Sequence, residues 1–153
     1  MDSIRTLHKI AMDEFNLPKG TRQEVNELLT ECKQTLTGVK MIQEPSPKSL
    51  DQLVSYGERC SVQILAARLN QIGVPAQAFD AWEVDFLTDS DFGDAQLLKD
   101  HEGTVQKAFE RIDPNVVAVV TGFIGHDPAG VLRVSSPHSL SSMGFDLLVP
   151  DFN

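Results

Sequence analysis

The chain has 153 residues, of which 41% are hydrophobic, so it is long enough to form one domain with a packed core. Its 22 acidic and 13 basic residues give a net charge of −9, which disfavours contact with phosphate backbones and anionic lipid surfaces. We therefore expect no nucleic-acid partner and no membrane partner. The first ten residues lack the composition of a secretory or transit peptide, so the sequence as written predicts a cytoplasmic protein. A plastid location would require an upstream transit segment.

Residues 1–42 predict two amphipathic helices. In the first, over residues 3–15, Ser3 can cap the start. The second opens with a capping box, because Thr21 and Glu24 can each bond the other's free backbone N–H, and we expect it to end at Gly38. The apolar positions are Ile4, Leu7, Ile10, Ala11 and Phe15 in the first helix, and Val25, Leu28, Leu29, Cys32 and Leu36 in the second.

A long helix and two short strands are predicted next. Prolines at 45 and 47 interrupt regular structure, and a helical pattern then runs from Ser49 to a stop at Gly73. Residues 74–79 predict one strand. Residues 80–94 predict a second short strand followed by an acidic loop, with Trp82, Val84 and Phe86 in the core of the sheet.

The later part of the chain predicts a helix over residues 95–112 and a strand over residues 115–124. The run from Val116 to Val120 is continuously apolar, which is typical of a strand covered on both faces in a parallel sheet. Helices that alternate with such strands predict an α/β layer architecture. Residues 134–153 show no clear period.

Cys32 and Cys60 are the only cysteines, and both fall at apolar positions of helical patterns. Free, packed thiols of this kind are typical of a reducing compartment. A structural zinc site needs two further ligands at short spacing, and the sequence offers none. We predict buried structural cysteines and no metal site.

Three segments, in this order, resemble the aspartate kinase branch of the amino acid kinase family. The first is Ser-Tyr-Gly-Glu at residues 55–58, which resembles a turn entering a long helix that ends in glycine. The second covers residues 74–81 with Phe-Leu-Thr-Asp and Asp-Phe-Gly shortly after. The third is Val-Val-Thr-Gly-Phe-Ile-Gly at residues 119–125. Together they span roughly residues 50–130.

The resemblance implies a partial amino acid kinase domain over residues 1–153, with residues 131–153 as a divergent tail. Its expected fold is the carbamate kinase-like three-layer α/β/α sandwich with a mainly parallel sheet, here incomplete. It also implies ATP-dependent phosphorylation of the side-chain carboxylate of L-aspartate, the first step toward lysine, threonine and methionine. Mg-ATP is the implied cofactor, L-aspartate and ATP are the implied ligands, and a homo-oligomer or a full-length kinase is the implied protein partner. A kinase acting on glutamate fits the first segment poorly.

The same resemblance places substrate-binding residues at the ends of two of these segments. Glu58 stands where the family's glutamate holds the substrate amino group, and Phe123 stands where a phenylalanine lines the pocket. Gly122 would let the backbone pass close to a ligand. A carboxylate at the opening of a helix can also pair with an ammonium ion. The residues alone leave plainer alternatives open, with Glu58 as a first-turn helix carboxylate and Phe123 as a core residue.

Two catalytic motifs of the family are not found in the sequence. One is the Lys-Phe-Gly-Gly strand and turn, whose lysine neutralises phosphate charge. The other is Gly-Arg-Gly-Gly-Ser-Asp after Gly130. Residues 139–146 can be aligned with this motif. In that alignment Asp146 is a substrate-site candidate, and Ser142 replaces the arginine.

We therefore expect no catalytic residue in this chain, no bound Mg-ATP and no phosphoryl transfer by the chain alone. Two alternatives are a degenerate, non-catalytic module that binds aspartate or pairs with a complete kinase, and a chain that reaches no stable fold.

Two further patterns have plainer explanations. Asp89 and Asp91 have metal-ligand chemistry, but an exposed acidic loop accounts for them. Ser135, His138 and Asp146 are the residue types of a hydrolase triad, yet the sequence contains no Gly-x-Ser-x-Gly elbow.

Overall fold

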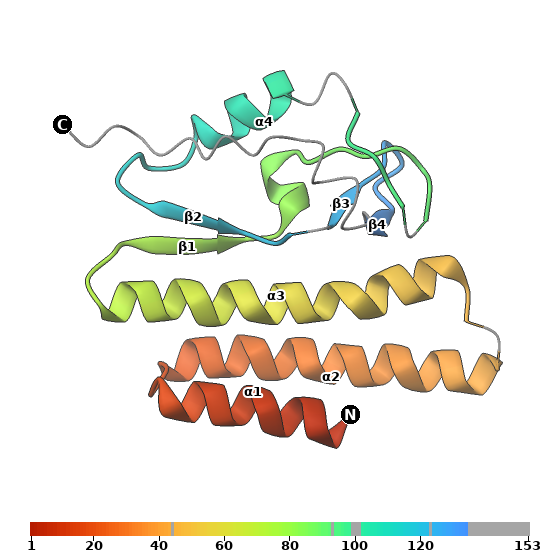
Figure 1. Cartoon of the computed structure of the whole chain (residues 1–153), viewed down its shortest axis with the longest axis horizontal. Helices are drawn as coiled ribbons and strands as arrows, with labels where there is room; N and C mark the ends of the chain where they lie inside the picture. Colours follow the sequence, from red (N-terminus) through yellow and green to blue (C-terminus); the bar gives the residue numbers. More distant parts are fainter. Residues whose placement is uncertain (44, 93, 99–101, 123, 135–153) are drawn as a thin grey trace.

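The computed structural model describes residues 1–153 except 44, 93, 99–101, 123 and 135–153. Figure 1 shows the described elements as layers, with α4 over one face of a small sheet, α3 along the other face, and α2 and α1 beyond α3. This arrangement confirms the incomplete three-layer α/β fold. The elements in chain order are α1 (Asp2–Glu14), α2 (Lys19–Ile42), α3 (Pro47–Gln71), β1 (Ala76–Phe79), the 3-10 helix η1 (Ala81–Val84), α4 (Glu102–Phe109), β2 (Val117–Val120), β3 (Ile124–His126) and β4 (Leu132–Val134).

Among the described residues, the strands form two pairs. β1 and β2 are parallel, with Ala76 opposite Val117, and β3 and β4 form an antiparallel hairpin. The parallel pairing agrees with the prediction. We expected both faces of the strand to be covered over Val116–Val120. In the structure Val119 is buried, but Val117 is 46% exposed, so the strand is only partly covered.

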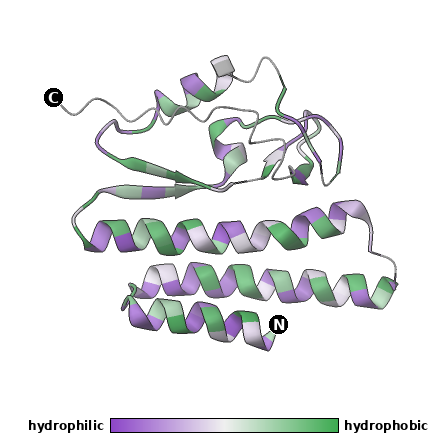
Figure 2. Ribbon diagram, viewed as in Figure 1, coloured by the Kyte–Doolittle hydropathy of each residue, from purple (hydrophilic) through white to green (hydrophobic). Residues whose placement is uncertain are grey.

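The core lies mainly between α2 and α3. The predicted stripe of α2, apart from the partly exposed Leu36, is buried against Tyr56, Cys60 and Ala67 of α3, and both cysteines are buried and free, as predicted. A second face of α3 packs on the sheet through Val62 and Ala66. Because α3 buries two faces, it fixes the distance between the helical layer and the sheet. Figure 2 shows apolar residues interleaved with polar ones along all three long helices.

The predicted apolar stripe of α1 is largely exposed. Ile4, Leu7 and Ile10 are 46%, 66% and 49% exposed, and the buried residue of α1 is Met12. Met12 joins the core between α2 and α3 together with Leu17, which follows the helix. The sequence pattern identified the helix and not the side that packs.

Helix boundaries differ from those predicted. Met1 occupies the N-cap position of α1 without a side-chain hydrogen bond, so Ser3 is not the cap. α2 begins at Lys19 after Pro18, which leaves Thr21 and Glu24 inside the helix with no capping box. It also continues past Gly38 to Ile42, since an interior glycine costs a helix only about 1 kcal/mol.

The second predicted strand, over residues 80–94, is found only as isolated β-bridges, from Leu87 to His126 and from Thr88 to Leu97. Its first part is η1, closed by a capping box between Asp80 and Glu83, so Trp82 and Val84 lie in a 3-10 helix and not in the sheet. The helix predicted over residues 95–112 is observed as the shorter α4, Glu102–Phe109. No described helix combines the length and the apolar character that crossing a lipid bilayer requires.

Candidate functional site

Glu58 lies in the middle of α3, not at the start of a helix. α3 begins at Pro47, where Ser46 Oγ accepts a hydrogen bond from Ser49 N at 3.2 Å, and it runs without a break past Gly57. The predicted turn before Glu58 is therefore wrong. The helix dipole acts on the first and last turns, so it gives the Glu58 carboxylate no special stabilisation.

The fold brings Glu58 and Gly122 together, although they lie 64 positions apart. The Gly122 N–H donates to Glu58 Oε2 at 3.3 Å. Gly122 follows the carboxyl end of β2, where ligands of open parallel sheets bind. A Cβ atom on Gly122 would lie 3.4 Å from Oε2, at the near limit of ordinary van der Waals contact. The other two predicted site residues, Phe123 and Asp146, lie outside the described residues.

The Glu58 carboxylate is half-buried, and within the described part of the chain no cation pairs with it. The neighbouring Arg59 is engaged elsewhere, with Nε 3.1 Å from Asp80 Oδ2 and Nη1 3.9 Å from Glu31 Oε2. A half-buried carboxylate with one amide donor and no counter-ion can accept a ligand ammonium group. Sequence spacing alone does not indicate that Arg59 pairs with Asp80 and Glu31 instead of Glu58.

The segment around η1 holds the turn that contains Gly122. Thr121 Oγ1 accepts from the Ala81 N–H at 2.8 Å, and both residues are buried. On the far side of the turn, a Cβ atom on Gly125 would lie 2.8 Å from the Phe86 carbonyl oxygen and 2.9 Å from Thr88 Cγ2. Gly125 is therefore required for close contact with the protein's own backbone, whereas the motif predicted that its glycines would let the backbone pass close to a ligand.

Beside the turn, the Trp82 ring lies between Arg59 and His126. The indole and imidazole rings stack with centroids 4.7 Å apart and an interplanar angle of 6°, and Arg59 Cζ lies 5.4 Å from the indole centroid. Burial lowers the pKa of His126, and the Asp127 carboxylate opposes that shift. Sequence spacing gave no signal for this group, which joins three separate segments.

The β3–β4 hairpin is closed by a buried ion pair. Arg133 Nη2 donates to Asp127 Oδ2 at 2.5 Å, and Asp127 Oδ1 accepts from Val131 N at 2.9 Å and Ala129 N at 3.0 Å. These backbone hydrogen bonds, with Val131 first, and the Arg133 guanidinium hold the pKa of Asp127 below its usual range. The Phe92 ring covers the guanidinium, with Arg133 Cζ 3.6 Å from the ring centroid. The pair therefore acts as a structural anchor for the hairpin.

One carboxylate of the acidic loop has a structural role within the loop. Asp89 Oδ1 accepts from Asp91 N at 3.2 Å and from Gln96 N at 3.1 Å, which shapes the loop. Across the described ranges, no three His, Cys, Asp or Glu side chains gather closely enough to hold a metal ion.

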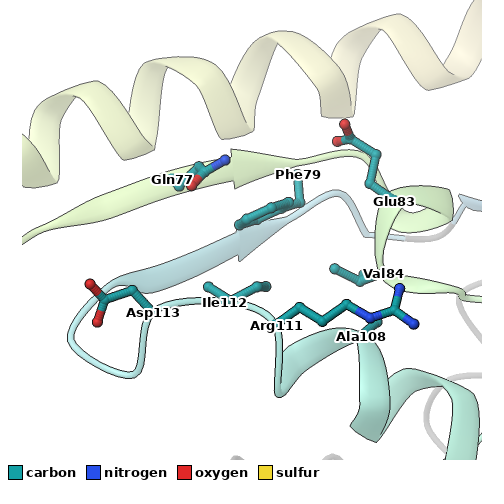
Figure 3. A pocket seen from close by; sticks show the side chains of 8 residues that line it. All are labelled: Gln77, Phe79, Glu83, Val84, Ala108, Arg111, Ile112 and Asp113. Carbon is teal, nitrogen blue, oxygen red and sulfur yellow. The ribbon is translucent and has the colours of Figure 1, made fainter.

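A separate cleft of about 260 Å³ opens between the sheet and α4. Figure 3 shows Phe79 and Ile112 along its middle, with Arg111 and Asp113 toward its margins. It lies on the face of the sheet opposite α3. Since Glu58 projects from α3, this cleft is distinct from the Glu58–Gly122 site.

The chain belongs to the amino acid kinase family, whose sequence profile matches residues 2–142. Relatives within that family include aspartate kinases. It is 37% identical over 128 residues to aspartokinase 1, chloroplastic, of Arabidopsis thaliana, covering 80% of this chain and 21% of the relative. It is 39% identical over 129 residues to an aspartate kinase of Pseudomonas fluorescens, covering 84% of this chain and 30% of the relative.

A solved structure has the same fold. E. coli aspartokinase III, in complex with aspartate and ADP, matches 89% of this chain with a TM-score of 0.77 and 25% sequence identity. The match covers 30% of that protein. The chain thus spans between a fifth and a third of the length of these aspartate kinases.

Proposed function

We propose that this chain forms the aspartate-binding side of an aspartate kinase, with Glu58 binding the ammonium group of L-aspartate. The observation that carries the proposal is the Glu58 carboxylate, half-buried and without a counter-ion among the described residues, 3.3 Å from the Gly122 amide. Its position beyond the carboxyl end of β2 suits a small ligand. The similarity to an aspartokinase solved with aspartate and ADP supports the same substrate.

In a complete kinase of this type, the γ-phosphoryl group of ATP passes to a side-chain carboxylate oxygen of L-aspartate, which gives aspartyl phosphate and ADP. Cations must neutralise the phosphate charge during that step. The described residues do not fit Mg-ATP: Arg59 beside the site is engaged by Asp80, and no cluster of metal ligands is found among them. The proposal for the described residues is therefore substrate binding and not phosphoryl transfer.

A thermal melt of the purified chain with millimolar L-aspartate tests the proposal. A ligand that binds only the folded state stabilises it and so raises the melting temperature. At a ligand concentration of about 100 times the dissociation constant, the gain in stability is about 2.7 kcal/mol. We expect L-aspartate to raise the melting temperature and succinate, which lacks the ammonium group, to have no effect. Glu58→Gln should abolish the shift.

Glu24→Gln is the matched control, because Glu24 is exposed on α2 and the same charge is removed. The control should retain the full shift. An equal response to aspartate and succinate, or a full response in Glu58→Gln, would refute the role of Glu58.

A further inference from the structure

We infer that Trp82 is a positioning residue of the proposed aspartate site, because its ring contacts both elements that carry the site. The inference rests on the proposed function. Glu58 belongs to α3, and Gly122 lies between β2 and β3. Trp82 touches α3 through Arg59 and β3 through His126.

The two ring contacts are close to the site residues along the chain. Arg59 directly follows Glu58, and its guanidinium is held in place by Asp80 at 3.1 Å while it lies 5.4 Å from the indole centroid. His126 ends β3, and its ring stacks on the indole at 4.7 Å. Trp82 thereby sets how far β3 lies from the part of α3 that carries Glu58.

The backbone on both sides of Trp82 is bonded to the same turn. The Ala81 N–H donates to Thr121 Oγ1 at 2.8 Å. Beyond η1, the His126 N–H donates to the Phe86 carbonyl at 3.1 Å, and the His126 carbonyl accepts from the Thr88 N–H at 2.8 Å. The backbone is thus held in place before and after Trp82. The indole ring of Trp82 lies between Arg59 and His126.

Removal of the ring would leave Arg59 and His126 without their shared contact. Interiors relax only partly around lost volume, so α3 and β3 would shift relative to each other. The 3.3 Å contact between Glu58 and Gly122 depends on that spacing. A residue that only added packing would lower stability and leave this contact unchanged.

The contact can be read without any ligand in the amide spectrum of the ¹⁵N-labelled chain. A Gly122 amide that donates to the Glu58 carboxylate changes its chemical shift as that carboxylate titrates, and Glu58→Gln removes this response. We expect Trp82→Ala to remove most of the response and Trp82→Phe to restore it. Phe109→Ala, which deletes a partly exposed ring from α4, is the control and should leave the response intact.

The affinity for L-aspartate, measured by calorimetry, is the second readout. We expect Trp82→Ala to weaken binding about three- to tenfold, the range that two aromatic contacts can supply, and Trp82→Phe to stay within about twofold of the wild type. Melting temperatures of all variants show whether each is folded.

The two readouts separate the inference from the proposed function. An unmodified chain that binds no aspartate refutes the proposed function, and the Gly122 response still decides whether Trp82 positions the turn. A Gly122 response in Trp82→Ala equal to the wild type overturns the inference. So does an equal loss in Phe109→Ala, because the effect would then be general to the fold.

Discussion

A Cβ atom on Gly122 would lie 3.4 Å from Glu58 Oε2, at the near limit of ordinary contact. The backbone there does not require glycine, since Gly122 does not have a positive φ. We therefore expect Gly122→Ala to change the free energy of unfolding by less than about 1 kcal/mol. The methyl group occupies the space beside the carboxylate, so aspartate affinity should fall by at least about tenfold. Calorimetry and a denaturant titration measure the two quantities, and unchanged affinity would contradict the placement of the ligand.

Gly125→Ala should be far more damaging to stability. Its Cβ atom would lie 2.8 Å from the Phe86 carbonyl oxygen, a backbone atom that cannot move without breaking its bond to the His126 N–H. We expect a loss of about 2–3 kcal/mol in unfolding free energy, as for other overpacked sites.

Gly38→Ala is the matched control for Gly125→Ala, because Gly38 lies inside α2 with nothing within 4 Å of its Cβ position. It should stabilise the chain by about 0.5–1 kcal/mol, since alanine is the better helix former. Urea denaturation of the two variants should therefore give changes of opposite sign. Similar changes would mean that the backbone contact at Gly125 is loose.

The sequence could predict α2, α3, β1 and β2, because each buries apolar residues at its own regular spacing. The helix predicted from Ser49 to Gly73 agrees closely with α3, and only its exact start was missed. Pro47 is tolerated at the first helical position, so the proline that signalled a break is the start of the helix. Gly57 is passed because α3 buries one face on α2 and another on the sheet, which outweighs the local cost of glycine.

The region after β1 could not be predicted for a different reason. Apolar residues at 82, 84 and 86 alternate as in a strand, but the capping box and the bond from Ala81 N to Thr121 Oγ1 impose a 3-10 helix. Glu58 and Gly122 were identified through family resemblance, and only the parallel sheet and the α3 packing bring them together. The Trp82 stack depends wholly on tertiary placement.

His126 should make stability depend on pH. Burial lowers its pKa below the ordinary value of about 6.5, so the folded chain binds this proton less readily than the unfolded chain. The associated stability is present above about pH 6.5 and is lost as the pH falls through the lowered pKa of the folded state. We expect the melting temperature to fall on acidification from pH 7. The melting temperature of His126→Phe, which keeps an aromatic ring against Trp82, should fall less. A NMR titration of His126 gives the pKa directly, and a value above 6.5 would contradict this prediction.

Both thiols should be unreactive in the folded chain. Burial, and secondarily the nearby Cys32, raises the pKa of Cys60 to about 11, and burial also raises the pKa of Cys32. The thiolate is the reactive form, so labelling with a disulfide reagent at pH 8 should be slow and limited by opening of the α2–α3 core. In guanidinium chloride, both cysteines should react rapidly. Rapid labelling under native conditions would show that the two helices separate readily.

The 153-residue chain should not phosphorylate aspartate by itself. Lys-Phe-Gly-Gly and Gly-Arg-Gly-Gly-Ser-Asp do not occur in its sequence, and the guanidinium of Arg59, next to Glu58 in the chain, is paired with Asp80. Without cations placed on the transferred phosphoryl group, the step loses its main stabilisation. We expect no ATP-dependent aspartyl hydroxamate above the no-enzyme rate, measured at aspartate concentrations that shift the melting temperature. Binding without hydroxamate formation would support the non-catalytic, aspartate-binding module, whereas ATP-dependent product that Glu58→Gln abolishes would show that the chain supplies its own cations.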